Sequence, residues 1–335
     1  MDTDNLKEVQ EHLIEIKNLN VQYSVDEGVV YAVNNLNLAI GYSETLGLVG
    51  ETGAGKTTTA RAILGLLPRP VGKVTQGEIL LRGENLLELD KKKMKKVRGK
   101  QIAMIFQDPM TSLNPVLRVG DQISEVILIH EKVSRLQAKL KAGQLLTQVG
   151  IKEERINDYP HQFSGGMKQR VVIAIALACN PHLLIADEPT TALDVTIQAQ
   201  ILDLMKNLKQ VHSSSMILIT HDLGVVAEIC DKVAIMYAGS VVEYATKEEL
   251  YENPKHPYTN GLFKSIPDLD LDDIEELSEI PGLPPDPTEI AQGCSFASRC
   301  KDSMDVCEKT TPSIFHFSDT HYVYCHKFAQ QGMKG

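Results

Sequence analysis

Gly50-Glu51-Thr52-Gly53-Ala54-Gly55-Lys56-Thr57 is the stretch of sequence that decides the fold. It fits the pattern G-x-x-x-x-G-K-[ST], in which a glycine-rich loop wraps phosphate groups with its backbone N–H groups. The apolar run Thr45–Val49 before it predicts a buried strand, and residues 57–67 after it, which end at Pro68, predict a helix. This order of strand, loop and helix is the context that the motif needs, so the sequence predicts a nucleoside triphosphate site.

Within this loop, the side chains and the backbone have different tasks. Lys56 is expected to reach the β and γ phosphates, and the Thr57 hydroxyl is expected to ligate Mg²⁺. The positive end of the following helix dipole favours an anion at the same place. The predicted nucleotide contacts are Gly50, Gly53, Ala54, Gly55, Lys56, Thr57 and Thr58.

A second segment, residues 183–188 (Leu-Leu-Ile-Ala-Asp-Glu), offers the carboxylates that hydrolysis needs. Its apolar strand carries Asp187 to the carboxyl end, where it can hold Mg²⁺ through water, and Glu188 lies beside it as a candidate general base. Alone, an acidic pair after a strand is often only the start of a helix. The phosphate loop upstream favours the catalytic interpretation.

Residues 163–170, Phe-Ser-Gly-Gly-Met-Lys-Gln-Arg, precede the helix that leads into the Asp187 strand. Ser164 is a good N-cap, and two glycines leave backbone N–H groups bare at a helix start, which makes an anion site. The segment resembles the signature of the ABC family. That resemblance implies that Ser164, Gly165 and Gly166 close on the γ phosphate held by a second ABC ATPase subunit, identical or related, so that two composite sites form in a dimer.

The other ABC motifs follow in order over residues 13–250. Tyr23 resembles the aromatic residue that stacks on adenine, and Gln107 resembles the Q-loop glutamine that senses Mg²⁺ and the membrane partner. Residues 191–194 resemble the D-loop, and His221 resembles the switch histidine that contacts the γ phosphate. Each has a plain structural alternative when taken singly. Their order and spacing imply an ATPase with ATP and Mg²⁺ as ligands and Lys56, Glu188 and His221 as catalytic residues.

The resemblance also implies an α/β fold: a P-loop NTPase core of RecA type, an antiparallel β subdomain, and a helical signature subdomain at about residues 108–165. The residue patterns agree with this fold. Short alternating stretches in residues 13–40 predict antiparallel strands, and apolar strands that alternate with helical patterns after residue 170 predict a largely parallel sheet. We therefore expect an ABC nucleotide-binding domain at residues 1–250 and a separate C-terminal domain at 251–335.

Several departures from the general family form identify a branch. Phe163 and Met167 replace the usual leucine and glutamine of the signature, and residues 107–115 and 192–198 carry a matching variant. The tail agrees at residues 253–259, 265–267 and 280–282. These segments resemble oligopeptide and dipeptide importers, which implies two transmembrane permease subunits as partners, an extracellular peptide-binding protein as an indirect partner, and a peripheral place on the cytoplasmic face of the cell membrane.

Composition limits the alternatives. The formal charge of −10 argues against a protein that mainly grips nucleic acid. The longest apolar run, residues 171–179, is shorter than the ~20 residues that a membrane helix needs, and the first 12 residues lack a secretory layout. The rival class is a soluble ABC ATPase that acts on ribosomes or DNA, but such proteins usually carry two cassettes or long coiled coils.

The tail beyond residue 251 is rich in proline, has an acidic stretch at 268–279, and ends with four cysteines spaced Cys294-x5-Cys300-x6-Cys307-x17-Cys325. Four thiolates suit either a tetrahedral zinc site or a cubane iron-sulfur cluster, and His316, His321 or His326 could complete a mixed zinc site. The spacing does not decide between them. Resemblance to dipeptide-importer ATPases with a cysteine-bound [4Fe-4S] cluster implies the cluster. Cys179 and Cys230 are expected to be small core residues.

Overall fold

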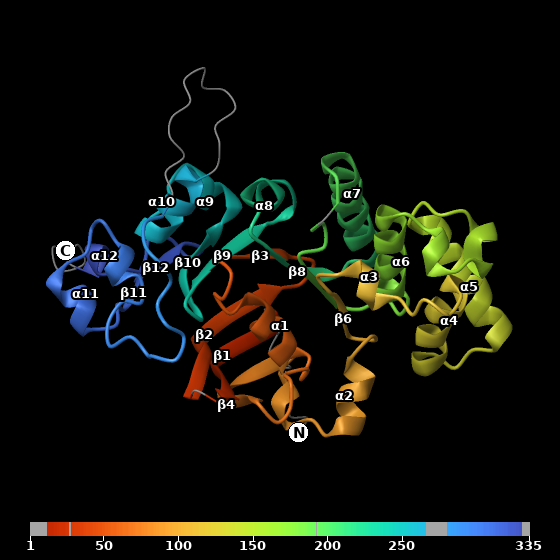
Figure 1. Ribbon diagram of the computed structural model, residues 1–335, viewed down its shortest axis with the longest axis horizontal. Coiled ribbons are helices and arrows are strands. Elements are labelled where there is room, and N and C mark those ends of the chain that lie inside the picture. Colours follow the sequence, from red (N-terminus) through yellow and green to blue (C-terminus); the bar gives the residue numbers. More distant parts are fainter. Residues whose placement is uncertain (1–11, 27, 192, 266–279, 330–335) are drawn as a thin grey trace, which may run out of the picture.

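The computed structural model describes residues 12–329 except 27, 192 and 266–279. The acidic stretch at 268–279, the Ile266-Pro267 pair of the tail and Ala192 of the D-loop segment therefore lie outside the described residues. The described chain forms two sheets that meet around the helix after the phosphate loop, with a group of helices at one end and the C-terminal elements at the other (Figure 1).

The larger sheet has eight strands in the order β11-β12-β10-β9-β3-β8-β7-β6. Five of them run parallel and form a continuous block that ends at the β6 edge: β6 (Ile102–Ile105), β7 (Leu183–Asp187), β8 (Ser215–Thr220), β3 (Thr45–Val49) and β9 (Lys232–Tyr237). Because β3, β7 and β8 are buried along their whole length, their sequences are mostly apolar instead of alternating, with polar residues only at their ends. The predicted α/β fold with a largely parallel sheet is confirmed.

The smaller sheet is antiparallel, in the order β2 (Gly28–Gly41), β1 (His12–Val25), β4 (Gly72–Leu81) and β5 (Glu84–Asn85). Its inner face packs on α1 (Lys56–Ile63), which it shares with the larger sheet. The sequence did not predict β4, because Gly77 interrupts its alternation with a φ of +101°. This sheet holds Tyr23 over the start of α1.

Helices flank the sheets, and most of those between β6 and β7 form one group. The chain between β6 and β7 forms α3 (Pro109–Ser112), α4 (Val119–His130), α5 (Arg135–Gln148) and α6 (Gly165–Leu177), and α4 and α5 lie at one end of the molecule (Figure 1). A capping box on Ser134 begins α5 and divides the expected helical stretch in two. The remaining helices include α2 (Lys91–Val97), α7 (Val195–His212), α8 (Leu223–Ile229), α9 (Lys247–Glu252) and α10 (Pro257–Lys264). Within the described ranges, no helix has the length and apolarity to cross a bilayer.

The C-terminal residues extend the larger sheet. β10 (Ser240–Thr246) pairs antiparallel with β9 on one side and with β12 (Tyr322–Tyr324) on the other, and β11 (Ile314–His316) forms the edge. The Tyr244 and Tyr322 rings stack with centroids 5.0 Å apart. Two short helices, α11 (Asp305–Lys309) and α12 (His326–Ala329), complete this region. The tail is therefore built onto the sheet that carries the phosphate loop.

Candidate functional site

The phosphate loop joins β3 to α1, and its neighbours allow only glycine at two positions. A Cβ on Gly50 would lie 2.2 Å from the Met236 carbonyl oxygen, and a Cβ on Gly55 would lie 2.5 Å from the Ala32 carbonyl oxygen. Both glycines also have positive φ angles, +156° and +97°. Gly55 caps α1 without a side-chain hydrogen bond, so no capping side chain competes for the first N–H groups of the helix, which could bind an anion.

The two polar side chains predicted to contact phosphate and metal, Lys56 and Thr57, begin α1. The Lys56 ammonium donates to the carbonyl oxygens of Gly50 (2.6 Å) and Glu51 (2.9 Å), and burial lowers its pKa. The Thr57 hydroxyl donates to Oδ1 of Asp187 at 3.0 Å. Burial raises the pKa of the Asp187 carboxyl, because it disfavours the charged form. A divalent cation at the Thr57 and Asp187 oxygens would stabilise the carboxylate.

Glu188 is the centre of a polar cluster at the carboxyl ends of three neighbouring parallel strands. Its carboxylate accepts from Gln107 after β6 (2.8 Å) and from the Thr191 hydroxyl (3.0 Å), and it lies 3.3 Å from Nδ1 of His221 after β8. Burial pushes its pKa up, but hydrogen bonds from Thr191, His221 and Gln107 outweigh burial and lower the pKa overall. The structure thus brings together Gln107, Glu188 and His221 as a carboxylate with two polar partners.

Glu188 also has a left-handed backbone conformation, with a φ of +46°. Non-glycine residues rarely adopt this conformation, and they retain it where the surrounding structure enforces it. Here its N–H donates to the Ile219 carbonyl oxygen at 2.9 Å. The turn therefore aims the side chain at Gln107 and His221.

Tyr23 and the signature segment complete the predicted set. The Tyr23 hydroxyl donates to the Thr58 hydroxyl oxygen at 3.2 Å, which places its ring beside the start of α1. Ser164 caps α6 by accepting from the Met167 N–H at 3.4 Å, and Gly165 and Gly166 form the first turn. A Cβ on Gly166 would lie 2.6 Å from Ile197 of α7, so the packing of α6 on α7 requires glycine there.

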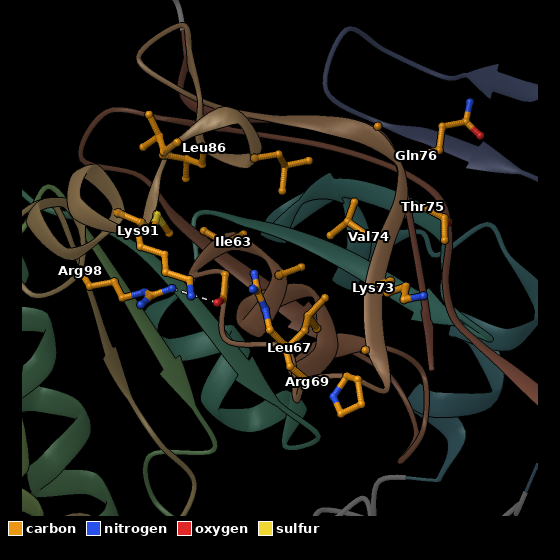
Figure 2. Close-up of a pocket in the computed structure, with 18 of the residues that line it drawn as sticks. Ile63, Leu67, Arg69, Lys73, Val74, Thr75, Gln76, Leu86, Lys91 and Arg98 are labelled. Carbon is orange, nitrogen blue, oxygen red and sulfur yellow. Dashed lines mark hydrogen bonds between the residues drawn. The ribbon is translucent and has the colours of Figure 1, made fainter. Parts of the chain in front are cut away.

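A wide groove of about 950 Å³ lies elsewhere, between α1, β4 and α2 (Figure 2). Its rim carries cationic side chains, among them Lys73, Lys91 and Arg98, and Arg98 is held by the carbonyl oxygens of Leu64 and Gly65. None of the predicted nucleotide contacts lines this groove. It is therefore distinct from the phosphate site.

All four tail cysteines line one small pocket, together with His256, Phe296 and His326. The Cys294 N–H donates to the Cys307 carbonyl oxygen at 2.7 Å, which joins the segment at Cys294 to α11. Burial raises the pKa of Cys294, Cys300 and Cys325, the last to about 11. Across the described part of the chain, however, no three His, Cys, Asp or Glu side chains are arranged to hold a single metal ion.

Sequence reasoning missed a contact between this tail and the phosphate loop. The Arg299 guanidinium, one residue before Cys300, forms a two-pronged ion pair with the Glu51 carboxylate. The Tyr258 hydroxyl accepts from the Glu51 N–H at 2.9 Å. No local pattern indicates such contacts, because 248 residues separate Glu51 from Arg299.

Comparison with known families gives two matches that divide the chain in order. Residues 33–191 match the family described as ABC transporter, and residues 242–307 match the oligopeptide/dipeptide transporter C-terminal region. The oligopeptide transport ATP-binding protein OppD of Bacillus subtilis is 54% identical over 93% of this chain and 87% of its own length. The dipeptide transport ATP-binding protein DppD of the same organism is 50% identical over 94% of both chains.

Among solved structures, the dimeric form of MJ0796, a bacterial ABC transporter cassette, aligns with a TM-score of 0.63 and 30% identity over 70% of this chain and 98% of that chain. A post-hydrolysis dimer of the same cassette with ADP and Pi gives the same TM-score at 29% identity. The phosphate loop, the Glu188 cluster and these likenesses agree. The chain belongs to the ABC transporter family, as an ATPase that carries the oligopeptide/dipeptide transporter C-terminal region.

Proposed function

We propose that this chain hydrolyses ATP to energise the import of dipeptides or oligopeptides. The observation that carries the chemistry is the Glu188 carboxylate, held by Gln107 and His221 next to the Thr57–Asp187 pair. Glu188 is ionised at neutral pH, so its carboxylate can orient the attacking water and accept its proton. Lys56 binds the β and γ phosphates, and His221 contacts the γ phosphate.

The donor set fits Mg²⁺, which prefers oxygen ligands. The Thr57 hydroxyl and the Asp187 carboxylate would hold the ion, directly or through water, with Gln107 as a further ligand. When bound, Mg²⁺ supplies charge neutralisation at the phosphates. Tyr23 stacks on the adenine ring, while the Ser164-Gly165-Gly166 segment of a second ATPase subunit closes the site from the other side.

Replacing Glu188 by Gln tests the assignment of the base. ATP affinity should stay within about threefold of wild type, while turnover should fall by about 10²–10⁴-fold and the protein should accumulate as a closed dimer with ATP. Glu228→Gln, an exposed change on α8, is the matched control and should leave turnover unchanged. Near-normal hydrolysis by Glu188→Gln would refute the assignment.

The peptide cargo rests on the relatives and on the C-terminal region, whose family is described by peptide transport. The chain would act as a dimer docked on two permease subunits at the cytoplasmic face of the membrane, and a peptide-binding protein would deliver the cargo. Co-purification with membrane subunits, and peptide-stimulated ATPase activity in reconstituted vesicles, would support this role. Co-purification with ribosomes or DNA would favour the rival class instead.

For the tail, we propose that Cys294, Cys300, Cys307 and Cys325 hold a [4Fe-4S] cluster. The support is that four sulfur donors from separate places in the tail line one pocket, and that soft thiolates are the ligands of such clusters. A single zinc ion is the weaker alternative, because the described residues offer no group placed around one ion. Ring nitrogens of His321 and His326 are engaged by Glu243 and by the Thr310 carbonyl oxygen.

The cluster would stabilise a region made of short elements. Burial raises the pKa of three of the thiols. Binding of the cluster should therefore release protons, and the affinity for the cluster should fall as pH falls. Anaerobic purification followed by iron, sulfide and zinc analysis and a visible spectrum tests the proposal. Cys300→Ala should lose iron and sulfide, whereas the control Cys179→Ala should keep them. A colourless protein loaded with zinc would overturn the cluster.

A further inference from the structure

We propose that Arg299 and Tyr258 are positioning residues that fix the phosphate loop from the C-terminal region and thereby set the affinity for ATP. This inference rests on the proposed role of residues 50–58 as the ATP site. It assigns a task to side chains that lie outside every nucleotide-binding motif of the sequence.

The Arg299 side chain has almost all of its donors committed. Its two terminal nitrogens lie 2.7 Å and 3.0 Å from the two oxygens of Glu51, and its Nε donates to the Pro281 carbonyl oxygen at 3.0 Å. The side chain is 5% exposed and lies near the rings of Tyr237 and Phe296. A guanidinium held in this way cannot follow Glu51 without breaking several contacts.

Tyr258 holds the backbone of the same loop residue. Its hydroxyl accepts from the Glu51 N–H at 2.9 Å, and its fully buried ring lies 4.7 Å from the Tyr237 ring. The Glu51 carbonyl oxygen in turn accepts from Lys56 at 2.9 Å. Every polar group of Glu51 thus has a partner: Tyr258 for its N–H, Arg299 for its carboxylate and Lys56 for its carbonyl oxygen.

A glycine-rich loop has few conformational restraints of its own, so its ordering has an entropic cost when it binds phosphate. Anchoring one residue from outside reduces that cost before the nucleotide arrives. The anchors come from α10 and from the turn that leads to Cys300. By linkage, a change in the four-cysteine region that moves Arg299 would change ATP affinity, and ATP binding would change that region in return.

A purely structural role for Arg299 makes a different prediction. In that case its loss would lower the melting temperature, but the protein that remains folded would bind ATP as wild type does. The positioning role predicts weaker ATP binding by folded protein, with the Michaelis constant affected more than kcat. Affinity and melting temperature must therefore be measured on the same samples.

The test uses the full-length protein with Arg299→Met, Glu51→Gln, the double variant, and Arg135→Met as a matched control at an exposed position on α5. Calorimetric titration with Mg-ATP should show a Kd raised about tenfold or more in each single variant. The double variant should be no weaker than the single ones, because one ion pair is lost in all three. Arg135→Met should bind as wild type.

Tyr258→Phe serves if Arg299→Met does not fold. It keeps the buried ring, removes only the acceptor for the Glu51 N–H, and should raise the Kd for ATP about three- to tenfold. Wild-type affinity in folded Arg299→Met, or in Tyr258→Phe where Arg299→Met does not fold, would overturn the proposal. A wild-type protein that fails to bind ATP would instead overturn the proposed function itself.

Discussion

Replacing Glu243 by Gln should destabilise the C-terminal region, and the size of the effect can be worked out from the contacts. Glu243 lies on β10 and is fully buried. Its Oε1 contacts the Lys255 N–H at 2.7 Å and Nε2 of His321 at 2.8 Å, while Oε2 accepts from the His256 N–H at 2.8 Å. One carboxylate thereby joins the loop before α10 to the chain before β12.

Glutamine can satisfy only one side of this arrangement. With its oxygen in the Oε1 position, its NH₂ group would face the His256 N–H and leave that buried donor without an acceptor, which costs about 1–3 kcal/mol. The two remaining hydrogen bonds lose their ionic acceptor, at about 1 kcal/mol each. Relief of the buried charge offsets part of this cost, so we expect the free energy of unfolding to fall by about 2–4 kcal/mol.

Urea unfolding followed by circular dichroism and tyrosine fluorescence measures this change, since the chain has no tryptophan. Glu248→Gln, at a side chain 67% exposed on α9, is the control and should stay within about 0.5 kcal/mol of wild type. Although burial opposes ionisation, hydrogen bonds led by that of His321 lower the pKa of Glu243. Its contribution is therefore lost as pH falls below the unfolded value of about 4.3. Equal stability of Glu243→Gln and wild type at pH 7 would refute the reasoning.

Three further predictions concern the loop, the metal pair and the response to pH. Gly50→Ala would place a Cβ 2.2 Å from the Met236 carbonyl oxygen, so calorimetry should detect no ATP binding; a Kd near that of wild type would contradict the packing argument. Thr57→Val removes the hydroxyl that donates to Asp187, so the Mg²⁺ concentration for half-maximal ATPase activity should rise about tenfold, and an unchanged Mg²⁺ requirement would count against this pair as the site. Burial lowers the pKa of His256 to about 4, and the unfolded chain therefore takes up a proton that the folded chain refuses below about pH 6.5. Stability should thus fall by about 2 kcal/mol between pH 8 and pH 5, and thermal melts of His256→Gln should lose this part of the pH dependence.

The cassette and the phosphate site could be predicted from sequence because their signals are local. The strand Thr45–Val49 has the predicted bounds, and α1 begins at Lys56, one residue before the predicted helix. Gln107, Glu188 and His221 each follow an apolar strand, and parallel strands bring their carboxyl ends to the same edge of a sheet. The order of motifs along the chain was therefore enough to predict that these three residues lie close together.

The tail could not be predicted in the same way, because its structure depends on contacts between distant segments. β11 and β12 have three residues each and carry no period that a sequence pattern can reveal. They form because the backbone N–H and C=O groups on the free edge of β10 would otherwise be unpaired, and because Glu243 contacts His321 just before β12. The four grouped cysteines line one pocket, whereas the link from Arg299 to Glu51 had no counterpart in composition or spacing.

The phosphate loop lies between two polar networks, and this arrangement bears on how its state is communicated. On one side, Thr57 contacts Asp187, whose neighbour Glu188 holds Gln107 and His221. On the other side, Glu51 is held by the C-terminal region. The loop is short and its ends are fixed to β3 and α1. A shift of Asp187 or of Glu51 would therefore move Lys56, whose ammonium donates a hydrogen bond to the Glu51 carbonyl oxygen. Packed interfaces of this kind move between discrete arrangements instead of deforming smoothly. Phosphate binding at Lys56 would therefore change the contacts of both networks.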